Sequence, residues 1–236
     1  MNDLITLMDK TWPPHAEHTE GPWIVREGRN GGNRVSSASL KGDEEAAIAQ
    51  IGLAEAAQAR LAQPSLFRLL PGEERLDAAL EAQGYRIAEP VYMRAGPAEA
   101  LAAEAPEHLT TFPLWPPLAV TATVWAAGGV GPERLAIMDL APAPKTVVLG
   151  RTDDRAAGAV FVAISGDTAM VHALHVATAM RRKGLALNLM RGVGRWALDN
   201  GAHNVALAVT RANIAANGLY EALGMNVVGS YHYRIK

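Results

Sequence analysis

Short apolar runs alternate with stretches of helical spacing through the second half of the chain, from about residue 118. Runs rich in Val, Ile and Ala predict strands at residues 145–150, 156–164, 168–176, 204–209 and 227–235. Helices are predicted over 182–200 and 213–223, and each is followed by a glycine of the kind that ends helices. Short helices are also predicted over 119–127 and 132–139. The order β-β-β-α-β-α-β predicts an α/β (α+β) fold with a mixed sheet flanked by helices.

The first half has a similar alternation on a smaller scale. Turn-forming residues 30–33 predict a hairpin between strands at 23–27 and 34–40. Further elements are predicted as a helix from Asp43 to about Leu61, a strand at 66–70, a helix at 75–83 and a strand at 86–94. Five prolines between residues 97 and 117 predict a linker. We therefore expect two parts, residues 1–110 and 111–236.

Charge and composition limit the classes of partner. The 236-residue chain has a formal net charge of −2 and no cysteine. A nearly neutral chain gives no electrostatic reason to expect a nucleic acid or a membrane surface as partner, and without cysteine there is no disulfide or thiolate chemistry. We find neither a signal peptide nor an uninterrupted apolar stretch of about 18 residues. The expected location is the cytoplasm.

The stretch VHALHVATAMRRKGLALNLM, residues 171–190, carries the clearest chemical signal. A strand is predicted to end at Val176, and a long helix opens a few residues later. The first N–H groups of a helix lack internal partners and suit a phosphate. Gly184 lets a ligand approach the backbone, and Ala186 keeps the next turn small. The alternative is an ordinary basic helix start. A dinucleotide fold fits less well, because its three-glycine motif is absent.

Two motifs in order resemble the GNAT (Gcn5-related N-acetyltransferase) superfamily. The pattern Q/R-x-x-G-x-G/A of that family is matched by Arg181, Gly184 and Ala186. The second pattern, N-x-x-A-x-x-L-Y-E-x-L-G-F, is matched from Asn213 through Tyr220 to Gly224, with Met225 in place of the usual aromatic residue. The resemblance covers about residues 118–236 and implies the GNAT fold with acetyl-CoA as co-substrate.

The resemblance also implies roles for individual residues. The pantetheine arm of acetyl-CoA would bind an exposed strand edge formed by Leu174, His175 and Val176. Its pyrophosphate would lie on the amides of the loop, beside basic side chains, at Arg181, Arg182, Lys183, Gly184, Leu185 and Ala186. Asn213 would contact pantetheine or cap its helix. Tyr220 would protonate the departing CoA thiolate.

The general base is not evident. Family members place a glutamate at positions that correspond here to Ala208 and Met170. His172 is two residues beyond Met170 on the same strand face and is the candidate base; the alternative is a core histidine. His172 and His175 are three apart on a strand, so we expect them on opposite faces and expect no metal site.

An internal repeat links the halves. Residues 80–85 (LEAQGY) align with residues 220–225 (YEALGM), and each segment leads into a strand that ends in an arginine, Arg94 or Arg234. The first copy has Leu80 where the second has Tyr220, and it lacks the phosphate loop. We therefore expect a tandem GNAT protein whose degenerate N-terminal half does no chemistry. Trp23, Arg26 and Arg34 would either contact an acceptor or simply pack.

These observations predict an acetyl-CoA-dependent N-acetyltransferase that modifies a primary amine. A CoA-binding sensor or assembly module without catalysis stays open, as does another acyl-CoA donor. The acceptor is not defined by the sequence. A homodimer formed through the final strand is also open.

Overall fold

The computed structural model describes residues 2–236, and these divide into two compact units. The larger unit contains the chain up to Trp12, Met93–Val209 and Asn213–Val228. The smaller unit contains Pro13–Tyr92, Thr210–Ala212 and Gly229–Lys236. Strands β5 (Arg86–Pro97) and β11 (Asn226–Ile235) therefore each contribute residues to both units.

The sheet of the larger unit has the strand order β5-β10-β9-β8-β7-β6. Its remaining strands are β6 (Thr111–Leu114), β7 (Lys145–Thr152), β8 (Arg155–Ser165), β9 (Thr168–Val176) and β10 (Asn204–Thr210). Strands β6 to β9 pair antiparallel, and β10 pairs parallel to β9. The turn between β8 and β9 is tight because Gly166 adopts a φ of 64°. The parallel pair is connected through α9 (Leu185–Asp199).

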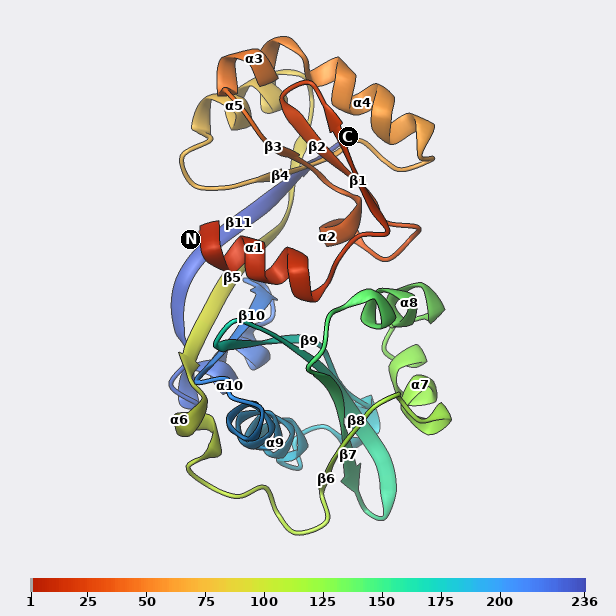
Figure 1. The fold of residues 1–236 in the computed structure, drawn as a ribbon, viewed down its shortest axis with the longest axis vertical. Helices are drawn as coiled ribbons and strands as arrows, with labels where there is room; N and C mark the ends of the chain where they lie inside the picture. The colour runs from red at the N-terminus through yellow and green to blue at the C-terminus, as the bar shows by residue number, and fades with distance from the viewer. Residues whose placement is uncertain (1) are drawn as a thin grey trace. The chain divides into compact units, whose positions relative to one another are not determined.

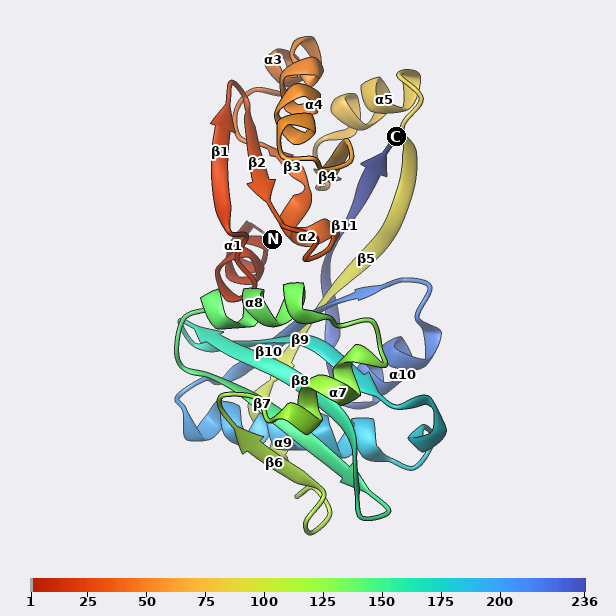
Figure 2. The same cartoon turned by 90° about the vertical axis from the view of Figure 1, so that its right-hand side faces the viewer.

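Helices cover both faces of this sheet (Figure 2). On one face α9 packs so closely that a β-carbon on Gly158 would lie 3.2 Å from both Leu185 and Leu189. The opposite face carries α1 (Asn2–Thr11), α7 (Ala119–Ala126) and α8 (Pro132–Leu140). There the ring of Trp12, just after α1, contacts that of Phe161 at 6.0 Å. The unit also contains α6 (Ala98–Ala102), the 3-10 helix η1 (Thr178–Met180) and α10 (Ile214–Ala222).

The smaller unit contains a sheet of order β1-β2-β3-β4-β11. Its elements, in chain order, are β1 (Ala16–Glu20), β2 (Trp23–Glu27), α2 (Asn33–Ser36), β3 (Ala38–Leu40), α3 (Glu44–Ala49), α4 (Ile51–Arg60), β4 (Leu66–Leu69) and α5 (Glu74–Ala82). Strands β3 and β4 are parallel, whereas the other pairs are antiparallel. Figure 1 shows these helices and strands with their labels.

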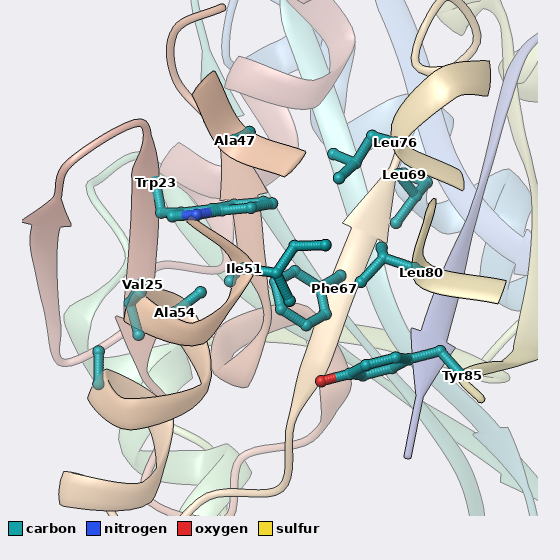
Figure 3. Close-up of a cluster of buried hydrophobic side chains, with 12 residues drawn as sticks. Trp23, Val25, Ala47, Ile51, Ala54, Phe67, Leu69, Leu76, Leu80 and Tyr85 are labelled. Carbon is teal, nitrogen blue, oxygen red and sulfur yellow. The ribbon is translucent and has the colours of Figure 1, made fainter. Parts of the chain in front are cut away.

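The core of the smaller unit is built around aromatic rings (Figure 3). The Phe67 ring meets Trp23 at 5.0 Å and Tyr85 at 5.3 Å, both edge to face. All three side chains are buried, and aliphatic residues of α4 and α5 fill the space around them. Edge-to-face contacts of this kind add to the stabilisation that burial provides.

The predicted mixed sheet flanked by helices is confirmed, and most strand positions agree. Several local predictions were wrong. The single helix predicted from Asp43 to about Leu61 is divided at Gln50 into α3 and α4. Helix α1 and strand β1 were not predicted. The proline-rich segment contains α6 and β6, because Pro113 lies on an edge strand where its missing N–H removes no ladder bond. The segment predicted as a strand from Arg34 begins with helix α2. Helix α9 begins at Leu185 instead of Arg182.

None of the helices formed by residues 2–236 combines the length and apolar character that crossing a membrane requires.

Replacing Phe67 with alanine should lower the free energy of unfolding by about 3–5 kcal/mol, because the fully buried ring would leave a cavity between Trp23 and Tyr85. Leu53→Ala is the control, since Leu53 is 42% exposed. Urea unfolding followed by fluorescence measures both. A Phe67→Ala effect no larger than that of Leu53→Ala would contradict this description of the core.

Candidate active site

Two parallel strands part in the middle of the sheet of the larger unit. The pairing of β9 with β10 runs only from Thr168↔Asn204 to Val171↔Leu207. Beyond that point β9 continues to Val176 and β10 to Thr210, and no further pair joins them. The edge of β9 that faces β10 is therefore unpaired from His172 onward. Backbone groups on such an edge are available to an extended ligand.

A β-bulge lies at the point where the strands part. On β8, Ala159 pairs with His175 and Phe161 pairs with His172, so Val160 alone faces the two residues Ala173 and Leu174. Ala173 adopts a left-handed φ of 51°, which is uncommon for a residue with a side chain. The extra residue bends β9 and turns its edge.

An indole hydrogen bond fixes the bulge. The Nε1 of Trp125, in α7, donates to the carbonyl oxygen of Ala173 at 2.8 Å. Trp125 is fully buried, whereas Ala173 is half-buried. The distorted part of β9 is thereby tied to the helix that follows the proline-rich segment.

The bulge overturns the expectation that His172 and His175 point to opposite faces. Cross-strand partners in a sheet share a face, and the partners Phe161 and Ala159 are two apart on β8. Both histidines therefore lie on the face of α1 and α7. The simple period of two along β9 is broken because one additional residue is inserted between them.

His172 lies in the interior of the larger unit. Its side chain is 3% exposed. Its Nε2 lies 2.9 Å from the Oγ1 of Thr11, and its ring is 5.0 Å from that of Trp12. A proton could reach His172 only by way of neighbours such as the Thr11 hydroxyl.

His175 has a different environment. Its Nε2 is buried and has no hydrogen-bond partner among residues 2–236. The imidazole also lies against Gly128, where a β-carbon would come within 2.2 Å of Nδ1. Burial, together with the nearby charge of Arg181, lowers the pKa of His175 below its ordinary value. His175 therefore has a neutral ring that packs against the segment after α7 and has a buried nitrogen without a partner among residues 2–236.

The loop after β9 forms the expected helix start. Gly184 is the N-cap of α9 with a φ of 77°, and Arg182 is also left-handed at 67°. No side chain caps this helix, and among the described residues no acceptor meets the amides of 185–187. Space around the position of a Gly184 β-carbon is open to 4 Å. The loop thus presents free N–H donors at the positive end of α9.

The three basic residues of the loop have different surroundings. Arg181 Nε donates to the carbonyl oxygen of Val176 at 3.1 Å, so its side chain folds back onto the end of β9. Lys183 forms an ion pair with Asp153 of the β7–β8 turn, which offsets its charge. Arg182 is exposed. The loop is held in shape by Arg181 and by the buried side chain of Leu185.

The second motif forms α10. Asn213 is its N-cap, and its side chain accepts from the amide of Ala216 at 3.2 Å. Tyr220 lies in the last turn and is 5% exposed. Burial raises the pKa of Tyr220 to about 12, and its hydroxyl makes no hydrogen bond to the described residues. The phenol is therefore protonated at neutral pH and its hydrogen is available.

Sequence reasoning missed the contacts that hold α10 in place. The side chain of Arg94, on β5, bonds to Asn217 and to the backbone of Met225. The only signal in the sequence was the arginine at the end of the repeated segment. The bulge at Ala173 gave no signal, because alanine is not a residue that favours positive φ.

Comparisons with known proteins agree with this arrangement. Residues 111–225 match a family described as "Acetyltransferase (GNAT) family". A relative in Bacillus subtilis (strain 168), described as "Uncharacterized N-acetyltransferase YobR", is 39% identical over 61 residues. That match covers 26% of this chain and only 25% of the relative's length.

Solved structures share the fold across most of the chain. A GCN5-related N-acetyltransferase from Kribbella flavida has a TM-score of 0.74 with 16% identity, covering 99% of this chain and 94% of that one. A tandem GNAT protein from the clavulanic acid biosynthesis pathway has a TM-score of 0.60 with 12% identity, covering 85% and 74%. At these identities the likeness is one of fold.

In the native protein the imidazole of His175 should titrate below pH 6.5, the ordinary value for histidine, because burial disfavours its charged form. The unfolded chain then binds more protons in that window, so His175 should reduce stability as pH falls from 6.5 towards its native pKa. Histidine NMR titration, with the signal assigned through His175→Gln, measures this. A native pKa above 6.5 would contradict the environment described.

Proposed function

We propose that this chain, whose residues 111–225 match the GNAT family, is an acetyl-CoA-dependent N-acetyltransferase acting on a primary amine. The observation that carries the proposal is the unpaired edge of β9 followed at once by the uncapped start of α9. These two features supply backbone donors and acceptors for an extended amide-bearing arm and N–H groups for a diphosphate. CoA contains an amide-bearing pantetheine arm that is followed by a diphosphate, which matches the order of these two features.

In this proposal each part of acetyl-CoA has its own set of residues. The pyrophosphate is bound by the amides of residues 182–186, with Arg181 holding the loop to β9. The pantetheine arm lies along Leu174–Val176. Asn213 keeps its observed role as helix cap and contacts the arm from the other strand. A backbone N–H near Val176 donates to the thioester oxygen as it gains negative charge.

Tyr220 is the proposed donor to sulfur. The amine nitrogen attacks the thioester carbon, the C–S bond breaks, and the thiolate must gain a proton while the new amide loses one. Because burial raises the pKa of Tyr220 to about 12, complete transfer of its proton to the less basic thiolate is unfavourable. Tyr220 therefore acts by donating a hydrogen bond to sulfur and relaying the proton released from nitrogen.

The proton of the attacking amine has two routes in the proposal. His172 can take it by way of the Thr11 hydroxyl, which lies 2.9 Å from its Nε2. His175 is the second candidate, since its neutral ring lies at the parted strands. A primary amine remains the proposed acceptor class, since its neutral nitrogen can attack the thioester carbon directly once its proton has been removed.

The N-terminal half, residues 1–110, is proposed to be a degenerate GNAT-like copy without chemistry of its own. Leu80 occupies the place of Tyr220 in its helix α5 and is fully buried. A leucine has no proton to give, and the first half lacks the R-x-x-G-x-A pattern of the phosphate loop.

Replacing Gly184 with valine should weaken CoA binding at least tenfold. The β-branched side chain would enter the space where the diphosphate is proposed to lie, and it would strain a residue at φ 77°. Calorimetry with CoA measures the affinity. Gly201→Val is a matched control, since Gly201 ends α9 with a φ of 81° and also has open space. Equal losses in both variants would count against the phosphate loop.

Replacing Tyr220 with phenylalanine should lower kcat by about 10²-fold while the affinity for acetyl-CoA stays within about threefold. The substitution removes only the hydroxyl, which has no protein partner to lose. Thiol release with a panel of primary amines measures kcat, and calorimetry measures affinity. Unchanged turnover would remove Tyr220 from the mechanism. Binding of acetyl-CoA without thiol release from any amine would favour a non-catalytic CoA-binding module.

A further inference from the structure

Arg94 connects the last strand of the N-terminal half to the helix that carries Tyr220. The side chain is 7% exposed. Its Nη1 donates to the carbonyl oxygen of Met225 at 2.8 Å, and its Nε donates to the Oδ1 of Asn217 at 3.1 Å. Strand β5 approaches this turn closely. A β-carbon on Gly96 would lie only 3.0 Å from the carbonyl oxygen of Gly224.

Met225, which accepts the bond from Arg94, is itself hydrogen-bonded to the backbone of Tyr220. The amide of Met225 donates to the carbonyl oxygen of Tyr220 at 2.9 Å, and the amide of Gly224 donates to that of Glu221 at 2.9 Å. This pair of bonds is a Schellman motif, which ends a helix with a left-handed residue. Arg94 thus holds the residue whose amide closes the last turn of α10.

The bond to Asn217 leads to the other end of α10. The side-chain amide of Asn217 donates to the backbone carbonyl of Asn213 at 3.0 Å. Asn213 in turn caps the helix by accepting from Ala216. A single buried guanidinium is therefore connected to the start and the end of a helix of nine residues.

The smaller unit contains the same arrangement. Arg234 Nη1 donates to the carbonyl oxygen of Tyr85 at 3.0 Å, and its Nε donates to the Oδ1 of Asp77 at 2.7 Å. The amide of Tyr85 donates to the carbonyl oxygen of Leu80 at 3.1 Å. Helix α5 therefore ends in the same motif, held by an arginine in the same way.

The two arrangements are related by a constant shift along the chain. The corresponding residues are 140 positions apart (234 − 94, 225 − 85, 220 − 80 and 217 − 77). Each half therefore gives its last strand, with its arginine, to the helix and turn of the other half. In the smaller unit the helix carries Leu80 and the contact serves folding alone. In the larger unit the same contact holds Tyr220.

We propose that Arg94, supplied by the N-terminal half, is a positioning residue that sets the orientation of Tyr220 in the reaction. This inference rests on the proposed function. It assigns the degenerate half a direct part in catalysis, because the site is incomplete without strand β5. Arg94 itself does not touch the reacting atoms.

The decisive variants are Arg94→Gln and Arg94→Lys, with Arg234→Gln as the matched control. Arg94→Gln should lower kcat at least tenfold with the KM for acetyl-CoA within about threefold, because the loop at Gly184 is not touched. Arg94→Lys should recover part of kcat, since its ammonium can still donate to Met225. Arg234→Gln should lose thermal stability but keep kcat. Equal kcat in Arg94→Gln and the wild type would overturn the proposal.

A double-mutant cycle separates positioning from general destabilisation. If Arg94 acts through Tyr220, Arg94→Gln combined with Tyr220→Phe should be no slower than Tyr220→Phe alone. If the two losses multiply, the proposal is wrong. The NMR signal of labelled Tyr220, assigned through Tyr220→Phe, should move in Arg94→Gln and stay in place in Arg234→Gln. Where Arg94→Gln does not fold, Asn217→Ala tests the same connection.

The proposed function and this inference fail in different ways. If Tyr220→Phe has wild-type turnover, Tyr220 is not the donor and the function must be revised. If Tyr220→Phe is slow but Arg94→Gln is not, the function stands and Arg94 is only a folding contact, as Arg234 is.

Discussion

The parting of β9 from β10 after Val171 is the constraint on which the rest of the site depends. Inside a sheet, every backbone N–H and C=O on a shared edge normally finds its partner in the neighbouring strand. Leaving such groups without partners costs free energy, so an unpaired edge in mid-sheet needs water or a ligand to satisfy it. A single departure from regular pairing thus creates the open edge of β9.

The bulge at Ala173 is the local means by which this departure is made. One added residue turns the edge of β9 and also reverses the phase of its side chains, so that His172 and His175 share a face. The consequence is chemical as well as geometric. One histidine is taken into the interior beside Thr11, and the other is left at the edge with an unused nitrogen. The Trp125 hydrogen bond to Ala173 shows that the surrounding helices support the distortion.

The sequence was sufficient for features that depend on local preference. The glycines after α5, α9 and α10 adopt the expected left-handed conformation, and Asn213 caps its helix as its residue type predicts. The sequence was insufficient for features whose conformation depends on tertiary contacts. Helix α1 buries Met8 and Trp12 only once β8 and β9 exist, and β6 tolerates Pro113 only because it is an edge strand. His172 and His175 lie on the same face of β9 because of the bulge at Ala173. The local preferences of these residues do not predict such contacts or the bulge.

The repeat supplies the strongest link between sequence and function. The alignment of residues 80–85 with residues 220–225, each followed by an arginine, was visible in the sequence, but the hydrogen bonds of Arg94 and Arg234 appear only in the structure. In each case the arginine lies on the last strand of one half and bonds to the turn that ends a helix of the other half. Divergence could then proceed at one position of an otherwise common framework. Leucine at position 80 completes a core, whereas tyrosine at 220 keeps a protonated hydroxyl without a protein partner. On the proposed assignment, the last strand of the N-terminal half supports the helix that carries Tyr220, through the Arg94 hydrogen bonds.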